Sequence, residues 1–266
     1  MRLTHRLITG MLGLLFSGCA GVQTAPTQEE RQALTPTGKL RVGILTGNPM
    51  HTIKDPATGE LKGTAIDIGK ELARRIGVPF EIVSYTSIAS VIGSVNSNHW
   101  DVVFFGMNPT TMKLLDFSAP YMEAEASYLV RPGSSISALS DVDRPGIRIA
   151  VPSKGGADVF LTRTLKNATL VRVSTINDGL EALKSGNADA FAALKTLLFP
   201  GMERVPGSRV LDGRLFAEPI GIGVPKGRAL AAAYVRRYVA DVKSEGLVKR
   251  SIEKAGLRGL VVAPLQ

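Results

Sequence analysis

The sequence predicts an α/β fold with two lobes. Short apolar segments typical of buried strands alternate with amphipathic segments typical of helices, and strands separated by single helices favour parallel sheets. The alternation restarts after residue 128, so two similar runs follow each other. A chain of 266 residues is long enough for two units of about 100–150 residues each. We therefore expect a ligand site in a cleft between the two lobes.

The first run contains three strands and two helices. Apolar residues recur at helical spacing over residues 66–76, and Gly77 and Pro79 end that helix. Residues 55–63 have the chemistry of a hairpin turn. Residues 88–95 place apolar side chains at positions i, i+3, i+4 and i+7, which predicts a second helix. The strands are expected at 40–45, 80–84 and 101–105.

The second run repeats this alternation of strands and helices, although no repeated sequence is evident. Its strands are expected at 148–151, 170–173 and 189–193. Its helices are expected at 158–165 and 176–185, and a longer helix follows at 229–245.

The N-terminus has the features of an export signal. A basic segment precedes an apolar run at residues 7–16, and small residues follow at 17–20. The run is too short for a membrane-spanning anchor. We expect the signal peptide to comprise residues 1–18, followed by a flexible tether over 19–38 that is rich in Thr, Gln and Pro.

Cys19 is the single cysteine of the chain, and it stands at the end of the apolar run. Residues 16–19 resemble a bacterial lipobox, in which the cysteine becomes the lipidated first residue of the mature protein. We expect lipidation at Cys19, and plain cleavage after Ala20 is the alternative. In both cases the mature chain has no disulfide.

Composition excludes several classes of protein. The hydrophobic fraction of 44% and the charged fraction of 21% are those of a globular protein. The formal charge of +9 invites a nucleic-acid partner, but the basic residues are scattered at helical spacing and stacking aromatics are few. Solvated helix faces explain the charge better, so we expect no nucleic-acid binding.

Five segments in order resemble the extracytoplasmic solute-binding proteins of the polar amino-acid type, the family 3 receptors of bacterial ABC importers. The most specific lies in NPTTMKLLDFSAPY, whose Asp116–Tyr121 half is typical of the ligand-grasping segment of that family. The resemblance covers residues 38–259. It rests on residues 38–43, 61–68, 101–121, 179–191 and 220–227.

This resemblance implies a periplasmic-binding-protein type II fold, with a mostly parallel sheet in each lobe and two crossing strands as a hinge. The crossings would fall near 124–128 and 216–221. Lobe 1 would comprise 39–125 and 219–260, and lobe 2 would comprise 126–218. The implied mechanism is closure around one solute and delivery to an ABC permease in the inner membrane. The implied protein is a periplasmic monomer without enzyme activity, cofactor or metal, and it touches the membrane only through its lipid anchor.

The residues that clamp an α-amino acid in this family are absent. Thr111 stands where an arginine holds the ligand carboxylate, and Leu194 stands where an aspartate accepts the ammonium group. Lys154-Gly155-Gly156 replace a Gly-Ser/Thr-Thr turn at a helix start. Losing both charges together avoids an uncompensated buried ion. The ligand is therefore expected to be a small organic solute, such as a carboxylate or a non-standard amino acid, rather than a common amino acid.

Other side chains are candidates for the rebuilt site. Phe104 and Gly106 are expected to face the cleft, with Phe105 turned to the core. Lys154, Lys195 and Lys113 could hold an anion, or they are ordinary surface lysines. The ligand-binding candidates are Asn48, Met50, Phe104, Gly106, Met107, Thr111, Lys154, Gly155, Gly156, Leu194, Lys195 and Glu218.

Two alternative functions remain open. A periplasmic dehydratase-like enzyme on the same fold would need an acid and a base, and Glu218 is the only attractive carboxylate. Asp67 is assigned to hydrogen bonding within the first helix, and His51 and His99 to the surface or loops. No triad, metal-spaced cluster or phosphate loop is evident. The other alternative is a sensor module that is not coupled to transport.

Overall fold

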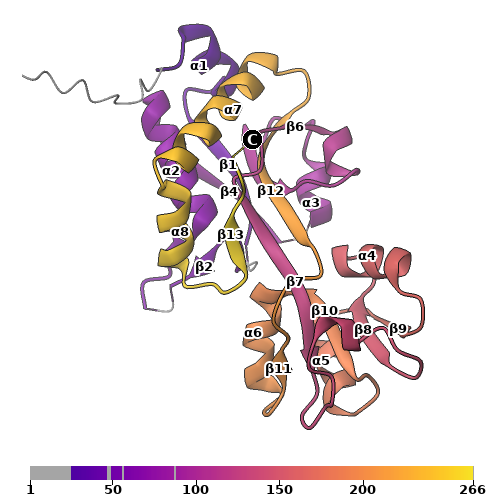
Figure 1. Ribbon diagram of the computed structural model, residues 1–266. Coiled ribbons are helices and arrows are strands. Elements are labelled where there is room, and N and C mark those ends of the chain that lie inside the picture. The colour runs from indigo at the N-terminus through magenta and orange to yellow at the C-terminus, as the bar shows by residue number, and fades with distance from the viewer. Residues whose placement is uncertain (1–24, 47–48, 56, 87, 266) are drawn as a thin grey trace, which may run out of the picture.

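The computed structural model describes residues 25–46, 49–55, 57–86 and 88–265, which form two lobes joined by long strands (Figure 1). The predicted signal peptide, Cys19 and Asn48 lie outside the described residues. One path of hydrogen-bonded strands runs through both lobes in the order β4-β1-β5-β12-β7-β10-β8-β9.

Lobe 1 is built on three parallel strands, β1 between β4 and β5, and β12 joins β5 in antiparallel orientation. In Figure 1, α2, α7 and α8 lie together on one side of this sheet and α3 lies on the other. Its strands are β1 (Leu40–Leu45), β4 (Phe80–Tyr85), β5 (Val102–Gly106), β6 (Leu115–Phe117), β12 (Ala217–Pro225) and β13 (Leu260–Val262), with the hairpin β2 (Ile53–Lys54) and β3 (Leu61–Lys62). Its helices are α2 (Thr64–Ile76), α3 (Ile88–Gly93), the short η1 (Thr111–Lys113), α7 (Ala229–Ser244) and α8 (Leu247–Ala255).

Lobe 2 has parallel strands β10, β8 and β9, with helices on both faces. On β10 the side chains of Ala190 and Ala192 enter one core cluster, whereas those of Phe191 and Ala193 enter another. Burial on both faces explains the continuous apolar sequence of this strand. The strands are β8 (Arg148–Pro152), β9 (Thr169–Val173), β10 (Ala190–Leu194) and β11 (Arg209–Val210), and the helices are η2 (Leu139–Asp141), α4 (Gly156–Thr164), α5 (Ile176–Lys184) and α6 (Lys195–Arg204).

Two strands cross between the lobes. β7 (Met122–Val130) pairs with β12 in lobe 1 and with β10 in lobe 2. The β7–β12 pair runs from Ala217 opposite Glu125 to Ile220 opposite Met122. This two-stranded ribbon is referred to below as the hinge.

Part of the predicted tether is a helix, because Gln28–Leu34 form α1. Thr27 and Glu30 form a capping box at its start, a pattern that the polar composition of the segment concealed. Leu34 is fully buried, and Glu30 accepts a 2.7 Å ion pair from Arg237 on α7. This end of the chain is therefore part of lobe 1.

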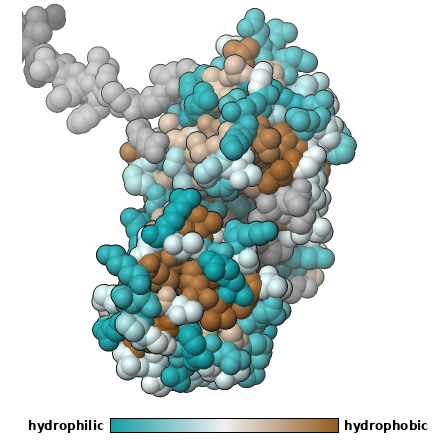
Figure 2. Space-filling model, turned by 90° about the vertical axis from the view of Figure 1, so that its right-hand side faces the viewer, coloured by the Kyte–Doolittle hydropathy of each residue, from teal (hydrophilic) through white to brown (hydrophobic). Residues whose placement is uncertain are grey.

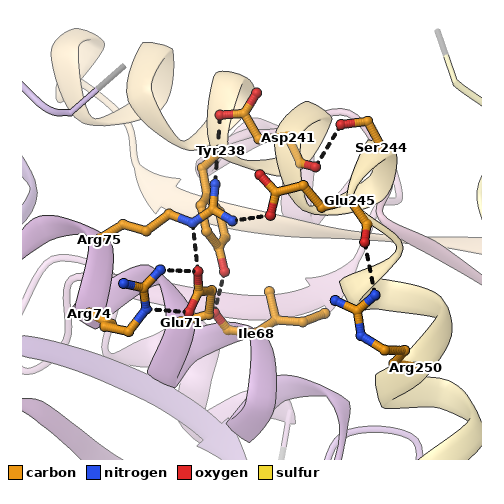
Figure 3. Close-up of polar contacts among 9 residues, drawn as sticks. All are labelled: Ile68, Glu71, Arg74, Arg75, Tyr238, Asp241, Ser244, Glu245 and Arg250. Carbon is orange, nitrogen blue, oxygen red and sulfur yellow. Dashed lines mark hydrogen bonds and ion pairs between the residues drawn. The ribbon is translucent and has the colours of Figure 1, made fainter. Parts of the chain in front are cut away.

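Arg75 joins α2 to the C-terminal helices (Figure 3). Its guanidinium pairs with Glu71 on α2 at 2.8 Å and with Glu245 after α7 at 2.5 Å. It also lies over the ring of Tyr238, whose hydroxyl donates to the carbonyl of Ile68. The Arg75 side chain is only 8% exposed, so these contacts between α2 and α7 lie within lobe 1.

Candidate functional site

The surface is hollowed between the two lobes on the side that carries α3 and α4 (Figure 2). The carboxyl end of β5 approaches this region from lobe 1, and the first turn of α4 approaches it from lobe 2. The start of β12 lies between them, as the contacts of Glu218 show.

Glu218 contacts a glycine of each lobe. A methyl group added to Gly106, the last residue of β5, would lie 2.3 Å from Oε1 of Glu218. A methyl group added to Gly156, the first residue of α4, would lie 3.8 Å from Oε2 of the same carboxylate and 3.4 Å from the ring of Phe216. The carboxylate of Glu218 therefore fits next to β5 only because Gly106 has no side chain.

No other described residue neutralises this carboxylate by a hydrogen bond or an ion pair. Burial raises the pKa of Glu218 above its ordinary value, because the charged form is removed from water without a compensating partner. A half-buried carboxylate without a counter-charge is a candidate for contact with a ligand.

The Thr111 side chain is committed to its own loop. Its hydroxyl lies 2.9 Å from the Gly106 carbonyl and 3.1 Å from the Asn108 carbonyl, and it accepts from the Asn108 N–H at 3.0 Å. Thr111 is only 2% exposed. The residue at the position of the family's arginine thus caps the loop after β5 and offers no charge to a solute.

The end of β10 also lacks a ligand charge. Leu194 packs against the core of lobe 1. Lys195 forms a 2.7 Å ion pair with Glu125 on β7, and its side chain is 13% exposed. The charge of Lys195 thus has a partner within the fold, and a contact between Lys195 and an anionic ligand stays a prediction.

The turn before α4 has the backbone of a glycine turn although it begins with a lysine. Lys154 has φ = 62°, in the left-handed region, and its N–H donates to Oδ2 of Asp158 at 2.8 Å. Its side chain is exposed, as is that of Lys113 at the end of η1. Gly155 is the residue before the first turn of α4, and Gly156 begins it.

Two predicted placements are corrected by the structure, those of Phe104 and Met50, whereas Phe105 lies in a core cluster as expected. Phe104 is 2% exposed and packs in the lobe 1 core, with its ring 5.7 Å from that of Tyr121. Phe105 is buried in the cluster on the other face, so both sides of β5 are covered. Met50 is also a core residue. Met107 is half-buried beside the hinge, since a methyl group on Gly221 would lie 2.9 Å from its sulfur.

His51 is buried rather than on the surface. It is 3% exposed, and its Nδ1 has no hydrogen-bond partner among the described residues. Burial lowers the pKa of His51 to about 4, so it is neutral at physiological pH. His51 is therefore a buried histidine in the segment that connects β1 to β2.

Asp67 is bonded to α8 rather than within its own helix. It accepts from Ser251 at 3.1 Å and from Lys254 at 2.9 Å. Across the described ranges, no group of His, Cys, Asp and Glu could hold a metal ion. Within the same ranges, no helix is long and apolar enough to cross a membrane.

Comparisons with known proteins identify relatives over most of the chain. Residues 40–256 match the bacterial extracellular solute-binding proteins, family 3. The ABC transporter glutamine-binding protein GlnH of Bacillus subtilis (strain 168) is 27% identical over 219 residues, which cover 80% of each chain. The L-arginine-binding protein of Pseudomonas aeruginosa is 25% identical over 228 residues, covering 81% of this chain and 86% of the relative.

Solved structures show the same architecture. The P235GK mutant of ArgBP from T. maritima superposes with a TM-score of 0.65 and 25% identity, over 85% of this chain and 99% of that one. The predicted α/β periplasmic-binding-protein fold and the predicted family are confirmed. The named relatives are binding proteins, in agreement with a binding protein rather than an enzyme.

Proposed function

The chain belongs to the family 3 bacterial extracellular solute-binding proteins, and on that premise we propose that it is the receptor of an ABC importer for a small organic solute other than a common α-amino acid. One relative is named as the glutamine-binding protein of an ABC transporter, and another is named as an L-arginine-binding protein. These names support a role in an ABC importer. The choice of solute is argued from this chain's own residues.

The observation that carries the proposal is the position of Thr111. Its hydroxyl is bonded to the loop after β5 and is buried, so the lobe 1 anchor for an α-carboxylate is absent. Leu194 likewise replaces the anchor for an α-ammonium group in lobe 2. Each charge-assisted contact is worth about 1.5–3 kcal/mol, so an ordinary amino acid would bind about two to four decades more weakly than to a receptor with both.

The mechanism is closure of the lobes about the hinge. A solute favours the closed state only if it contacts both lobes. Gly106 and Met107 would supply the lobe 1 side, and the Lys154–Gly156 turn would supply the lobe 2 side. The closed, loaded form would then dock on the permease and release the solute.

Thermal melting of the mature chain, which lacks residues 1–18, against a panel of solutes tests the proposal. The panel holds the standard amino acids together with small carboxylates, amines and sugars. A ligand at a hundredfold its Kd adds about 2.7 kcal/mol, which for a protein of this size raises Tm by about 5–10 °C. We expect such a shift only with solutes outside the standard amino acids, and a large shift with glutamine or arginine would overturn the proposal.

We also propose that lipidation at Cys19 anchors the receptor. The position of Cys19 at the end of the apolar run supports this. Mass spectrometry of the N-terminal peptide from membranes should show a diacylated cysteine, and Cys19→Ala should release the protein from the membrane fraction. An unmodified N-terminus at Gly21 would show plain cleavage instead.

A further inference from the structure

The two faces of the hinge differ in charge. Residues directly opposite each other in an antiparallel pair share a face, and successive residues alternate between faces. Ala217 is opposite Glu125 and Pro219 is opposite Glu123, whereas Glu218 is opposite Ala124. Glu218 therefore lies on the face of the hinge that does not carry Glu123 and Glu125.

The charges on the face that carries Glu123 and Glu125 neutralise one another. Lys195 pairs with Glu125 at 2.7 Å, and Arg214 lies 3.4 Å from Glu123 and 3.9 Å from Glu125. These two cations are thus occupied on the side of the hinge away from Glu218. Among the described residues, Glu218 is left as a carboxylate without a counter-charge.

The surroundings of Glu218 suit an organic cation. The ring of Phe216 and Oε2 of Glu218 both lie next to Gly156, and Phe216 packs against Phe160 with the ring centroids 5.1 Å apart. The Met107 N–H donates to the carbonyl of Pro219, and its sulfur lies beside Gly221 on the opposite face of β12, so Met107 is not among the neighbours of the Glu218 carboxylate. A carboxylate next to aromatic rings can recognise an ammonium group, because the ring faces and the carboxylate both attract positive charge.

This inference rests on the proposed receptor function and names its solute class. We propose that Glu218 binds the cationic group of a small amine or ammonium solute that lacks an α-carboxylate, between Gly106 of lobe 1 and Gly156 of lobe 2. The missing arginine leaves nothing to balance a ligand carboxylate, whereas a positive charge would stabilise the ionised form of the unpaired Glu218. A cation at this point touches both lobes, so its binding favours closure.

Titration calorimetry with matched pairs of probes tests the inference on the mature chain. The pairs are agmatine and arginine, cadaverine and lysine, and choline and glycine betaine, which differ chiefly by a carboxylate. We expect measurable binding of at least one carboxylate-free member, with its partner at least about tenfold weaker, the lower end of the loss from one unbalanced charge.

Variants assign the binding to Glu218. Glu218→Gln keeps the shape and removes the charge, so it should weaken amine binding about 10- to 100-fold. Gly106→Ala adds a methyl group 2.3 Å from Oε1 and should displace the carboxylate and weaken amine binding too. Glu123→Gln on the opposite face is the matched control and should leave the affinity unchanged. Circular dichroism and melting of each variant confirm that it folds.

The outcomes of these experiments distinguish a failure of this inference from a failure of the proposed receptor function. Amine affinity that survives Glu218→Gln overturns the inference. Binding of a carboxylate that depends on Lys154, as shown by its loss in Lys154→Ala, overturns the inference but leaves the receptor function standing. Absence of binding by every probe and by the wider solute panel overturns both.

Discussion

Arg41 and Asp101 form a bidentate ion pair in lobe 1 that Arg148 and Asp189 repeat in lobe 2. The Arg41 guanidinium donates to the Asp101 carboxylate at 3.0 and 2.7 Å, and the backbone N–H of Arg41 donates to the same carboxylate at 2.9 Å. The corresponding distances from Arg148 to Asp189 are 3.2, 3.3 and 3.0 Å. Each arginine also donates to the carbonyl three residues before its aspartate, Asn98 or Gly186. In both lobes, therefore, the same kind of ion pair joins the start of one strand to the start of its parallel neighbour.

The two ion pairs should contribute unequally to stability. Asp101 has a fully buried side chain, whereas Asp189 is 12% exposed and its partner Arg148 is 42% exposed. Asp101→Asn should cost about 3–5 kcal/mol, because it leaves Arg41 buried without its counter-charge. Asp189→Asn should cost about 1–2 kcal/mol. Urea unfolding of both variants measures the difference, and equal losses would show that burial is not what distinguishes the lobes.

His51 should make stability depend on pH. Its pKa is about 4 in the fold and 6.5 ordinarily, so between these values the unfolded chain takes up a proton that the native chain does not. Stability is therefore fully present above pH 6.5 and falls as the pH drops, by about 3 kcal/mol in all. Denaturant unfolding from pH 7 to pH 4 should show this slope, and His51→Leu should remove it. His99→Leu is the control on an exposed histidine, and a slope that persists in His51→Leu would refute the assignment.

The hydroxyl of Thr111 should act on stability rather than on solute choice. Thr111→Val removes the contacts to the Gly106 and Asn108 carbonyls and to the Asn108 N–H, at a cost of about 1–3 kcal/mol. Thr111→Ser keeps the hydroxyl and should retain most of the stability. Thermal melting of the two variants measures the loss. A Val variant that melts normally but changes its solute preference would show instead that the hydroxyl faces the ligand.

Secondary structure could be predicted closely because local patterns specify it. β1 was expected at residues 40–45 and is found at Leu40–Leu45, and the helix expected at 66–76 ends where Gly77 adopts φ = 74°. α1 could also have been found, since Thr27 and Glu30 show the spacing of a capping box. Polar composition alone suggested a tether, and burial of Leu34 against the lobe decided otherwise.

The site could be predicted only in part, because its contacts join distant residues. The apolar sequence of β5 is buried on both faces, so it gives no alternation to show whether Phe104 turns to the core or the cleft. The pairing of Lys195 with Glu125 depends on where α6 meets β7. The isolation of Glu218 follows from the register of β7 and β12, which no local pattern contains.

Glu218 should lower stability at neutral pH in the absence of solute. Its pKa is raised above 4.5 by burial, so the group contributes most to stability when protonated, and this contribution is lost as the pH rises through the raised pKa. Glu218→Gln should therefore be more stable than the wild type at pH 7, by about 1 kcal/mol or more, and the advantage should vanish below pH 4.5. Glu218 and His51 change the pH dependence of stability in opposite directions. The contribution of Glu218 is therefore taken from the difference in unfolding free energy between the variant and the wild type at each pH.

Unfolding in urea at several pH values, with and without the amine probe, measures this difference. Saturating amine should stabilise the wild type and leave Glu218→Gln almost unchanged, because the probe supplies the counter-charge that the fold lacks. A Gln variant that is less stable than the wild type at every pH would mean that the carboxylate supports the hinge itself. The combination of higher stability and lost binding in one variant would instead identify Glu218 as a charge kept for the ligand, at a cost to the empty receptor.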